Sequence, residues 1–163
     1  MQPLRLHFSV PWFLPGAFRF QIRSIELDTR INYPYGSYRY FPVSQITLST
    51  GDVFARARLR ALEIDESLRF IFEQIENLPE GEIRGDAGDA EPVSGVVSIT
   101  EGWRGEIVHI AVTDEKGGIV QYKIKDPSFN NWYGLSLALR KTEISDFPLC
   151  NKSFDLSYAG HDL

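Results

Sequence analysis

The sequence predicts an α+β fold in which a long amphipathic helix packs with a small antiparallel sheet containing a β-hairpin, followed by C-terminal helices. Two patterns carry this prediction. Apolar residues recur at alternating spacings of three and four between residues 54 and 78, which is the period of a helix. Between residues 93 and 125, apolar runs flank a turn rich in glycine, which is the pattern of a hairpin.

The long helix is expected to begin at residues 49–52 and to end before Pro79. Thr50 is the expected N-cap, because its hydroxyl can accept a bond from a free backbone amide, and Asp52 lies near the positive end of the helix dipole. The face expected to be buried carries Phe54, Ala57, Ala61, Ile64, Leu68, Ile71, Ile75 and Leu78. The face expected to be in solvent carries Arg56, Arg60, Glu63, Glu66 and Glu73.

The segments around this helix are predicted from their turn-forming residues. Residues 28–48 hold the turn-forming residues Pro34, Gly36 and Pro42 among aromatic side chains, so we expect them to be irregular or extended. Residues 82–92 are polar and rich in glycine, which predicts a mobile loop. Neither segment is expected to form a regular element.

Three strands are predicted, over residues 93–100, 105–113 and 119–125. Residues 114–118 form the turn between the last two, because Gly117 and Gly118 tolerate positive φ. A second helix is predicted over residues 130–141, with Trp132, Leu135, Leu137 and Leu139 as candidates for burial. Residues 144–154 are predicted to be either a short helix or an irregular connector.

The composition sets limits on function. A chain of 163 residues with 43% apolar residues is expected to form one domain with a real core. Its net charge of -5 argues against a nucleic-acid-binding surface. The single cysteine, Cys150, excludes an internal disulfide and a multi-cysteine metal site, and is expected to be a buried small apolar residue. His109, in an apolar strand, is expected to be structural.

Residues 1–21 are treated as a separate, atypical apolar N-terminal arm, and residues 22–163 as the domain. Pro3, Pro11 and Pro15 interrupt any helix in the arm. The arm is too short and too interrupted to cross a bilayer. Two interpretations remain open: the chain is a fragment or one part of a split gene, or the arm packs on the domain or on a partner.

Three ordered blocks of the sequence resemble one protein superfamily. Residues 28–35 (Asp-Thr-Arg-Ile-Asn-Tyr-Pro-Tyr), residues 101–106 (Glu-Gly-Trp-Arg-Gly-Glu) and the closing segment from Asp155 to Gly160 follow one another in the family's order. They are similar to the C-terminal part of nickel–iron hydrogenase large subunits and of the large quinone-site subunit of complex I. Within this superfamily the membrane-bound energy-converting branch is the nearest in character.

The resemblance implies a candidate site. The hydrogenases end in Asp-Pro-Cys-x-x-Cys, whereas here Ser157 and Gly160 stand at the places of the two nickel-binding cysteines. A hydroxyl and a bare backbone cannot replace two thiolates, so no metal is expected. Residues expected to line the former metal cavity, or a quinone site, are Arg104, Asp155, Ser157, His161 and Asp28.

Arg104 and His161 each also have an interpretation that involves no functional role. Arg104 either projects into the cavity, where its five donors could hold an anionic or carbonyl oxygen, or pairs with Glu106, Asp28 or Asp155. His161, near the C-terminus, either relays a proton or is exposed and frayed. Trp103 replaces the proline usual in the family, and the terminal Asp162-Leu163 departs from the family's Asp-Arg ending.

The resemblance therefore implies a part of a hydrogenase-like or NADH–quinone oxidoreductase large subunit in a membrane-associated electron-transfer complex. No cofactor is expected on this chain; quinone and an iron–sulfur cluster would belong to the assembly, and NADH binds a different subunit in the resembled complexes. Implied partners are the N-terminal half of a large subunit, an iron–sulfur small subunit and membrane-arm subunits, with the chain peripheral on the cytoplasmic side and soluble when expressed alone. The isolated chain is expected to be inactive and to self-associate through exposed apolar surface. The alternative is a non-catalytic assembly or regulatory module.

Overall fold

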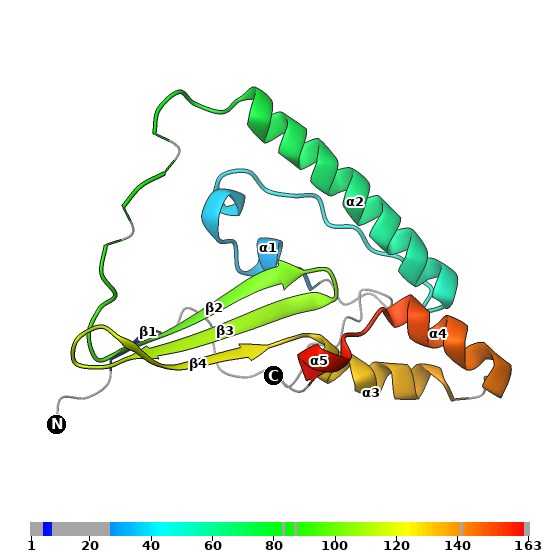
Figure 1. The fold of residues 1–163 in the computed structure, drawn as a ribbon. Coiled ribbons are helices and arrows are strands. Elements are labelled where there is room, and N and C mark those ends of the chain that lie inside the picture. The colour runs from blue at the N-terminus through cyan, green and yellow to red at the C-terminus, as the bar shows by residue number, and fades with distance from the viewer. Residues whose placement is uncertain (1–4, 8–26, 83, 87, 141, 162–163) are drawn as a thin grey trace.

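The computed structural model describes residues 5–7, 27–82, 84–86, 88–140 and 142–161. A sheet lies along one side of the molecule, the long helix α2 runs along another, and the C-terminal helices gather where the two approach each other (Figure 1). The elements are β1 (Arg5–His7), α1 (Thr29–Asn32), η1 (Gly36–Arg39), α2 (Val53–Glu76), β2 (Ser94–Gly102), β3 (Gly105–Thr113), β4 (Ile119–Lys125), α3 (Ser128–Ala138), η2 (Ile144–Asp146), α4 (Phe147–Phe154) and α5 (Tyr158–His161). The predicted α+β class is confirmed.

The sheet has the strand order β1-β2-β3-β4, with β2, β3 and β4 antiparallel and β1 parallel to β2. The strands β3 and β4 have the predicted bounds, and β2 runs two residues beyond its predicted end. In the turn before β4, Gly117 adopts a φ of 80° and the Asp114 carboxylate accepts bonds from the amides of Lys116 and Gly118, each at 2.8 Å. The predicted hairpin is therefore confirmed.

The N-terminal arm contributes the edge strand β1, which pairs with residues 94–96 of β2. The other residues of the predicted arm, 1–4 and 8–21, lie outside the described residues. The division of the chain at residue 22 stays a prediction.

The prediction that residues 28–48 lack regular structure is wrong for two short stretches. Helix α1 forms because the Asp28 carboxylate caps it by accepting a bond from the Arg30 amide at 2.9 Å. The 3₁₀ turn η1 follows within the same segment. These turns place Asp28, Arg30 and Tyr35 beside β2.

Helix α2 is confirmed, but its predicted cap and its predicted packing face are wrong. The N-cap is Asp52, whose carboxylate accepts a bond from the Ala55 amide at 2.7 Å, and not Thr50. The two residue types are both good caps, so composition alone could not choose between them.

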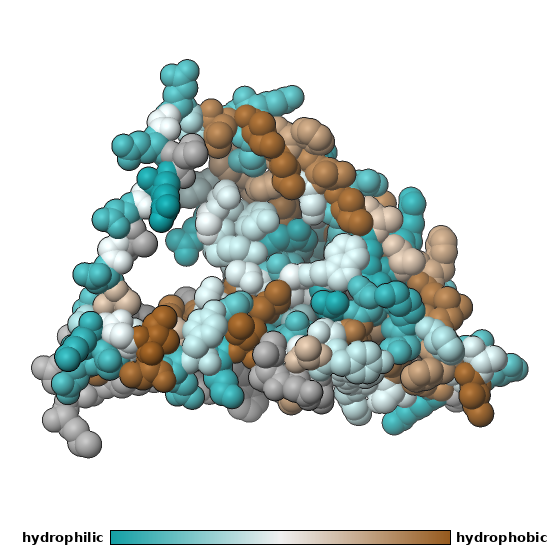
Figure 2. All heavy atoms as spheres, in the orientation of Figure 1, coloured by the Kyte–Doolittle hydropathy of each residue, from teal (hydrophilic) through white to brown (hydrophobic). Residues whose placement is uncertain are grey.

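The face of α2 that packs on the rest of the chain is largely the charged one. The buried residues of the helix are Ala55, Arg56 and Leu59. The stripe expected to be buried is exposed, with Phe54 at 74% and Ile75 at 63% of full exposure. The sequence identified the stripe correctly as one face, but that face meets solvent here (Figure 2).

Helix α3 begins two residues before its predicted start, because the Asp126 carboxylate accepts a bond from the Ser128 amide at 2.7 Å. Of its apolar candidates Leu135 is buried, while the others are half-buried. The segment 144–154, left open between helix and connector, forms η2 and the helix α4.

The apolar core of the described residues is small and consists of Val43, Ala55, Leu59, Leu135 and Cys150. The predicted burial of Cys150 is confirmed. Large apolar side chains are exposed on α2, on the sheet and on α3 and α4, so the predicted exposed apolar surface is present. Self-association through it stays a prediction. Among the described residues, none of the helices combines the length and the hydropathy needed to span a membrane.

Candidate functional site

The tip of the β2–β3 hairpin and the closing segment of the chain meet at Arg104 and Asp155. Arg104 lies in the turn that joins the two strands, and its Nε donates to the backbone carbonyl of Asp155. Its Nη2 lies 4.0 Å from the Asp155 carboxylate. On the neighbouring residue of the tip, the Trp103 indole Nε1 donates to the same carboxylate at 3.1 Å. Of the three acidic partners considered for Arg104, the structure therefore selects Asp155.

Asp155 is positioned by the end of α4. It occupies the C-cap in the left-handed conformation, with φ 52° and ψ 45°, which aspartate tolerates better than most residues. A hydrogen bond from Lys152 lowers the pKa of the Asp155 carboxyl; burial opposes it, and a bond from Trp103 and the charges of Lys152 and Arg104 lower it further. Asp155 is therefore an anion that ties the closing segment to the hairpin tip.

Ser157 and Gly160 turn toward a different neighbour, the start of α3. The Ser157 amide donates to Ser128 Oγ at 3.0 Å, and Ser157 Oγ accepts a bond from the Gly160 amide at 2.9 Å. A Cβ built on Gly160 would lie 2.6 Å from Cγ of Asp126. No side chain fits at residue 160 unless Asp126 moves.

These contacts test whether the closing segment suits a nickel centre. Two positions carry nickel-binding cysteines in the hydrogenases. Here Ser157 has a hydroxyl that already accepts a bond within the segment, and at Gly160 the Asp126 side chain leaves no room for a side chain. In addition, His, Cys, Asp and Glu side chains form no group of three or more with metal-binding geometry in the described part of the chain. The residues present here therefore do not fit a nickel ion.

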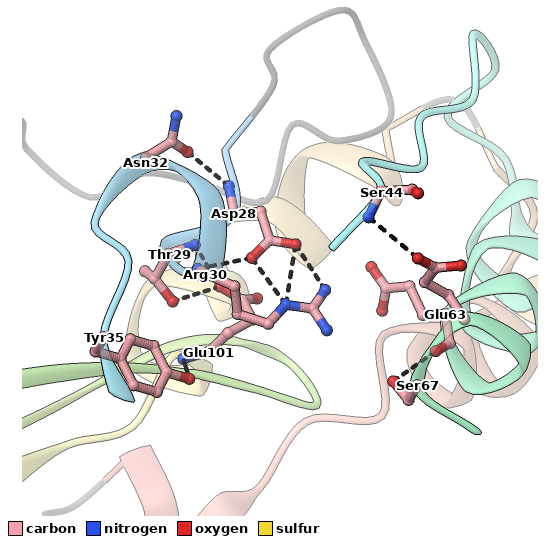
Figure 3. A network of polar contacts seen from close by, with 10 residues as sticks. Asp28, Thr29, Arg30, Asn32, Tyr35, Ser44, Glu63, Ser67 and Glu101 are labelled. Atoms are coloured by element: carbon pink, nitrogen blue, oxygen red, sulfur yellow. Dashed lines mark hydrogen bonds and ion pairs between the residues drawn. The ribbon is translucent and has the colours of Figure 1, made fainter. Parts of the chain in front are cut away.

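Asp28 lies in a second cluster, which α1, Tyr35 and Glu101 of β2 form together (Figure 3). Its carboxylate is 4% exposed and receives Arg30 Nε at 3.0 Å and Nη2 at 2.6 Å, a bidentate pair. Glu101 of β2 accepts bonds from the amide and the hydroxyl of Thr29 at 3.1 and 3.0 Å. Asp28 thus pairs with Arg30, whereas Arg104 bonds to Asp155.

Charge and burial shift two pKa values in this cluster. The hydrogen bond to Asp28 raises the pKa of Arg30, with burial acting in the opposite direction and the charges of Asp28, Glu101 and Glu63 adding to the increase. Burial raises the pKa of Tyr35, whose hydroxyl accepts a bond from the Glu101 amide at 3.1 Å. Arg30 is therefore a fixed cation.

A cavity of about 400 Å³ opens beside this cluster, between α2 and the hairpin. It has a charged and aromatic wall from α1, η1 and β2 and a partly apolar wall from α2, lined together by Arg30, Tyr38, Glu63, Ile64, Ser67, Leu68, Glu101, Gly102 and Trp103. Arg30 and Glu101 were not predicted as site residues. The available signal was that each stands in the same motif as a predicted residue, Arg30 with Asp28 and Glu101 with Arg104.

Two other predicted residues are placed as follows. His161 ends α5, and its side chain lies outside the described residues. His109 Nδ1 is 2.6 Å from the Tyr122 hydroxyl on the neighbouring strand, in agreement with a structural histidine. The structure therefore brings Arg104 and Asp155 together, with Ser157 close in the chain, and pairs Asp28 with Arg30.

Comparison with known proteins gives the family. The model for "Respiratory-chain NADH dehydrogenase, 49 Kd subunit" matches residues 23–94 and 86–162. Hydrogenase-4 component G of Escherichia coli (strain K12) is 29% identical over 140 residues, which cover 86% of this chain and 25% of that protein. An NADH-quinone oxidoreductase subunit of Syntrophobacter fumaroxidans is 33% identical over 125 residues, covering 75% of this chain and 34% of that protein.

A solved structure shares the fold. In the membrane-bound sulfane sulfur reductase, an archaeal respiratory membrane complex, one chain superposes with a TM-score of 0.77 at 21% identity, over 88% of this chain and 41% of that one. This chain thus spans only about a quarter to a third of the two curated relatives. The extent of the family match shows that the chain belongs to the family of the 49 kDa subunit of respiratory-chain NADH dehydrogenase.

Proposed function

We propose that this chain is the C-terminal part of a hydrogenase-like or NADH–quinone oxidoreductase large subunit, working in a membrane-associated electron-transfer complex without a nickel–iron centre of its own. The observation that carries the proposal is the family match, which runs from the Asp28 region to the closing segment. The lack of space for a side chain at Gly160 supports the absence of nickel from this chain, because Asp126 occupies the space that a second thiolate would need.

Within such a complex, the residues at the hairpin tip are suited to binding rather than to covalent chemistry. The Arg104 side chain is 28% exposed and Asp155 32%, so both can reach a molecule held by a neighbouring polypeptide. A guanidinium offers several donors in a fixed plane and suits a carbonyl or anionic oxygen. We assign Arg104, Asp155 and Ser157 to one wall of a cavity of which partners supply the remainder. His161 and Asp28 are the further candidates.

The proposed partners are of the kind found in the multi-subunit complexes to which the relatives belong. We propose that the N-terminal half of a large subunit, an iron–sulfur small subunit and membrane-arm subunits complete the assembly, with this chain peripheral on the cytoplasmic side. Two comparisons support this arrangement: one relative is named as a component of hydrogenase-4, and the solved neighbour is a chain of an archaeal respiratory membrane complex. Quinone and the iron–sulfur cluster would be held by the assembly, and the chain alone would be inactive.

The first test is co-purification of the tagged chain from mildly solubilised membranes of its own host, followed by mass spectrometry and metal analysis. Recovery of the rest of a large subunit and an iron–sulfur protein, with no nickel beyond that of a control purification, is the expected result. Stoichiometric nickel in the purified chain would contradict the nickel-free site. Recovery of the chain alone would contradict the assembly.

A non-catalytic assembly or regulatory module is the second candidate, and one observation favours it. Arg104 and Trp103 already bind Asp155, so the hairpin tip has a structural role whatever else it does. Arg104→Ala in the assembled complex separates the two candidates. A cavity residue predicts lost turnover with normal assembly and partial recovery in Arg104→Lys, whereas a purely structural residue predicts lost assembly or no effect.

A further inference from the structure

The guanidinium of Arg60, on α2, caps the C-terminal end of α4. Its Nη1 donates to the Ser153 carbonyl at 2.7 Å, and its Nη2 donates to the Phe154 carbonyl at 2.9 Å. The last four carbonyls of a helix lack amide partners within it. In α4 the two carbonyls before Ser153 accept bonds from the Asp155 amide. All four carbonyls are thus satisfied, two of them by a side chain from another helix.

The chemistry of this contact suits an arginine. Carbonyls at a helix C-terminus carry partial negative charge, so a cation stabilises them. A guanidinium offers two donors side by side in one plane, and its face remains available for an aromatic ring. Such a ring is present, because Arg60 Cζ lies 5.6 Å from the centre of the Trp103 ring. Arg60 therefore also contacts the tip of the β2–β3 hairpin.

These contacts lie on both sides of the Arg104–Asp155 contact. On the hairpin side, Trp103 is the neighbour of Arg104, and its indole Nε1 donates to the Asp155 carboxylate at 3.1 Å. On the other side, the two carbonyls that Arg60 binds directly precede Asp155, whose own carbonyl accepts a bond from Arg104 Nε. One side chain from α2 thus holds both of the segments that meet at the candidate site.

We propose that Arg60 is a positioning residue of the candidate site, which holds the hairpin tip and the end of α4 so that Arg104 meets Asp155. The use of this site in an electron-transfer complex rests on the proposed function, whereas the positioning is a property of the chain. Asp155 adopts a left-handed conformation, with φ 52° and ψ 45°, which a residue with a side chain keeps only where its surroundings hold it. Its partner within the closing segment, Lys152, is 84% exposed and holds it weakly.

The test measures hydrogen exchange of the Trp103 indole N–H at neutral pH, by NMR on the full chain, with the signal assigned through Trp103→Phe. Arg60→Gln removes the charge and the paired donors but keeps a long side chain. We expect the Trp103 indole proton to exchange about three to ten times faster, which is the change that the loss of one ordinary hydrogen bond produces. The indole of Trp132, half-buried on α3, is the internal reference and should keep its rate.

Two controls separate positioning from charge and from stability. Arg58→Gln removes the same charge from an exposed residue of α2 and should leave the Trp103 rate unchanged. Loss of a nearby cation alone would slow base-catalysed exchange, because a cation attracts hydroxide, so faster exchange reports the lost bond. A general loss of stability would speed exchange at both Trp103 and Trp132.

Arg60→Lys is the second variant and keeps the measurement decisive if circular dichroism shows that Arg60→Gln unfolds. Lysine retains the charge but not the planar pair of donors, so the Trp103 rate should rise by less than in Arg60→Gln. In the assembled complex, Arg60→Gln should lower turnover with its partners still recovered, because Arg104 is present but no longer held against Asp155. Arg60→Lys should restore part of that turnover.

An unchanged Trp103 exchange rate in the folded Arg60 variants would overturn the positioning role. Full turnover of an Arg60→Gln complex would overturn the importance of that role for the site. Recovery of the chain without partners would instead contradict the proposed function, and the exchange rate of Trp103 would still decide whether Arg60 positions the hairpin tip.

Discussion

Replacing Arg56 by alanine should lower the free energy of unfolding by about 3 kcal/mol, because this arginine joins α2 to α4 from a buried position. Its residue exposure is 8%. Nε donates to Ser153 Oγ and Nη1 to the Gly51 carbonyl, each at 2.8 Å. The guanidinium also lies 4.3 Å from the centre of the Phe154 ring.

The magnitude follows from these contacts. A hydrogen bond from a charged donor contributes at least about 1.5 kcal/mol net, so the two bonds account for about 3 kcal/mol. The interaction with the Phe154 ring adds about 1 kcal/mol. Burial lowers the pKa of Arg56, which shows that the buried cation carries a desolvation cost. We take that cost to offset the ring interaction.

The assay is urea unfolding followed by circular dichroism at a concentration low enough to keep the chain monomeric. Arg58→Ala, on the exposed side of the same helix, is the control and should change the free energy by less than about 0.5 kcal/mol. Arg56→Met should lose nearly as much as Arg56→Ala, because it keeps apolar packing but not the donors. A loss below about 1 kcal/mol for Arg56→Ala would refute the assignment of α2–α4 cohesion to this residue.

Three further predictions follow from other contacts. Asp28→Asn should lower the free energy of unfolding by about 3 kcal/mol, measured in urea, because it leaves the largely buried Arg30 without its bidentate partner; an effect near zero would contradict that role. Gly160→Ala should lower it by about 1–3 kcal/mol through the contact with Asp126, whereas Gly85→Ala, with open space around it, should have little effect. Burial, and to a smaller extent Glu101, raises the pKa of Glu106 against the effect of Lys125. The folded state therefore holds this proton more tightly than the unfolded state, and its contribution to stability is complete below the ordinary carboxyl pKa and is lost as pH rises through the raised pKa. Glu106→Gln should accordingly raise the unfolding midpoint at neutral pH and change it little in acid, and equal effects at both would contradict burial as the cause.

The elements predicted most accurately from the sequence are those specified locally. Strands β3 and β4 begin and end where expected, because a turn with two glycines separates two apolar runs. Helix α3 begins two residues earlier than expected, directly after Asp126, whose carboxylate accepts a bond from the Ser128 amide. In each case the decisive residues lie within a few positions of the element.

Contacts between distant segments could not be predicted in this way. Helical periodicity shows that Ile64, Leu68 and Ile71 share a face, but it carries no information on whether that face meets this chain or another molecule. The bonds from Thr29 to Glu101 connect residues 72 positions apart, so no local pattern indicates them. The meeting of Arg104 and Asp155 was expected only through the family resemblance, and the structure agrees with it.

The uneven attachment of α2 has a consequence for its motion. Its buried residues, Ala55, Arg56 and Leu59, all lie in the first two turns of a 24-residue helix. Because local opening is easiest where buried contacts are few, amide hydrogen exchange should become faster from the first turns of α2 toward Glu76. The buried contacts that hold the helix therefore lie near its N-terminal end. Any molecule that covers the exposed apolar face of α2 would slow exchange most near Glu76, so this gradient in exchange rate reports whether that face is covered.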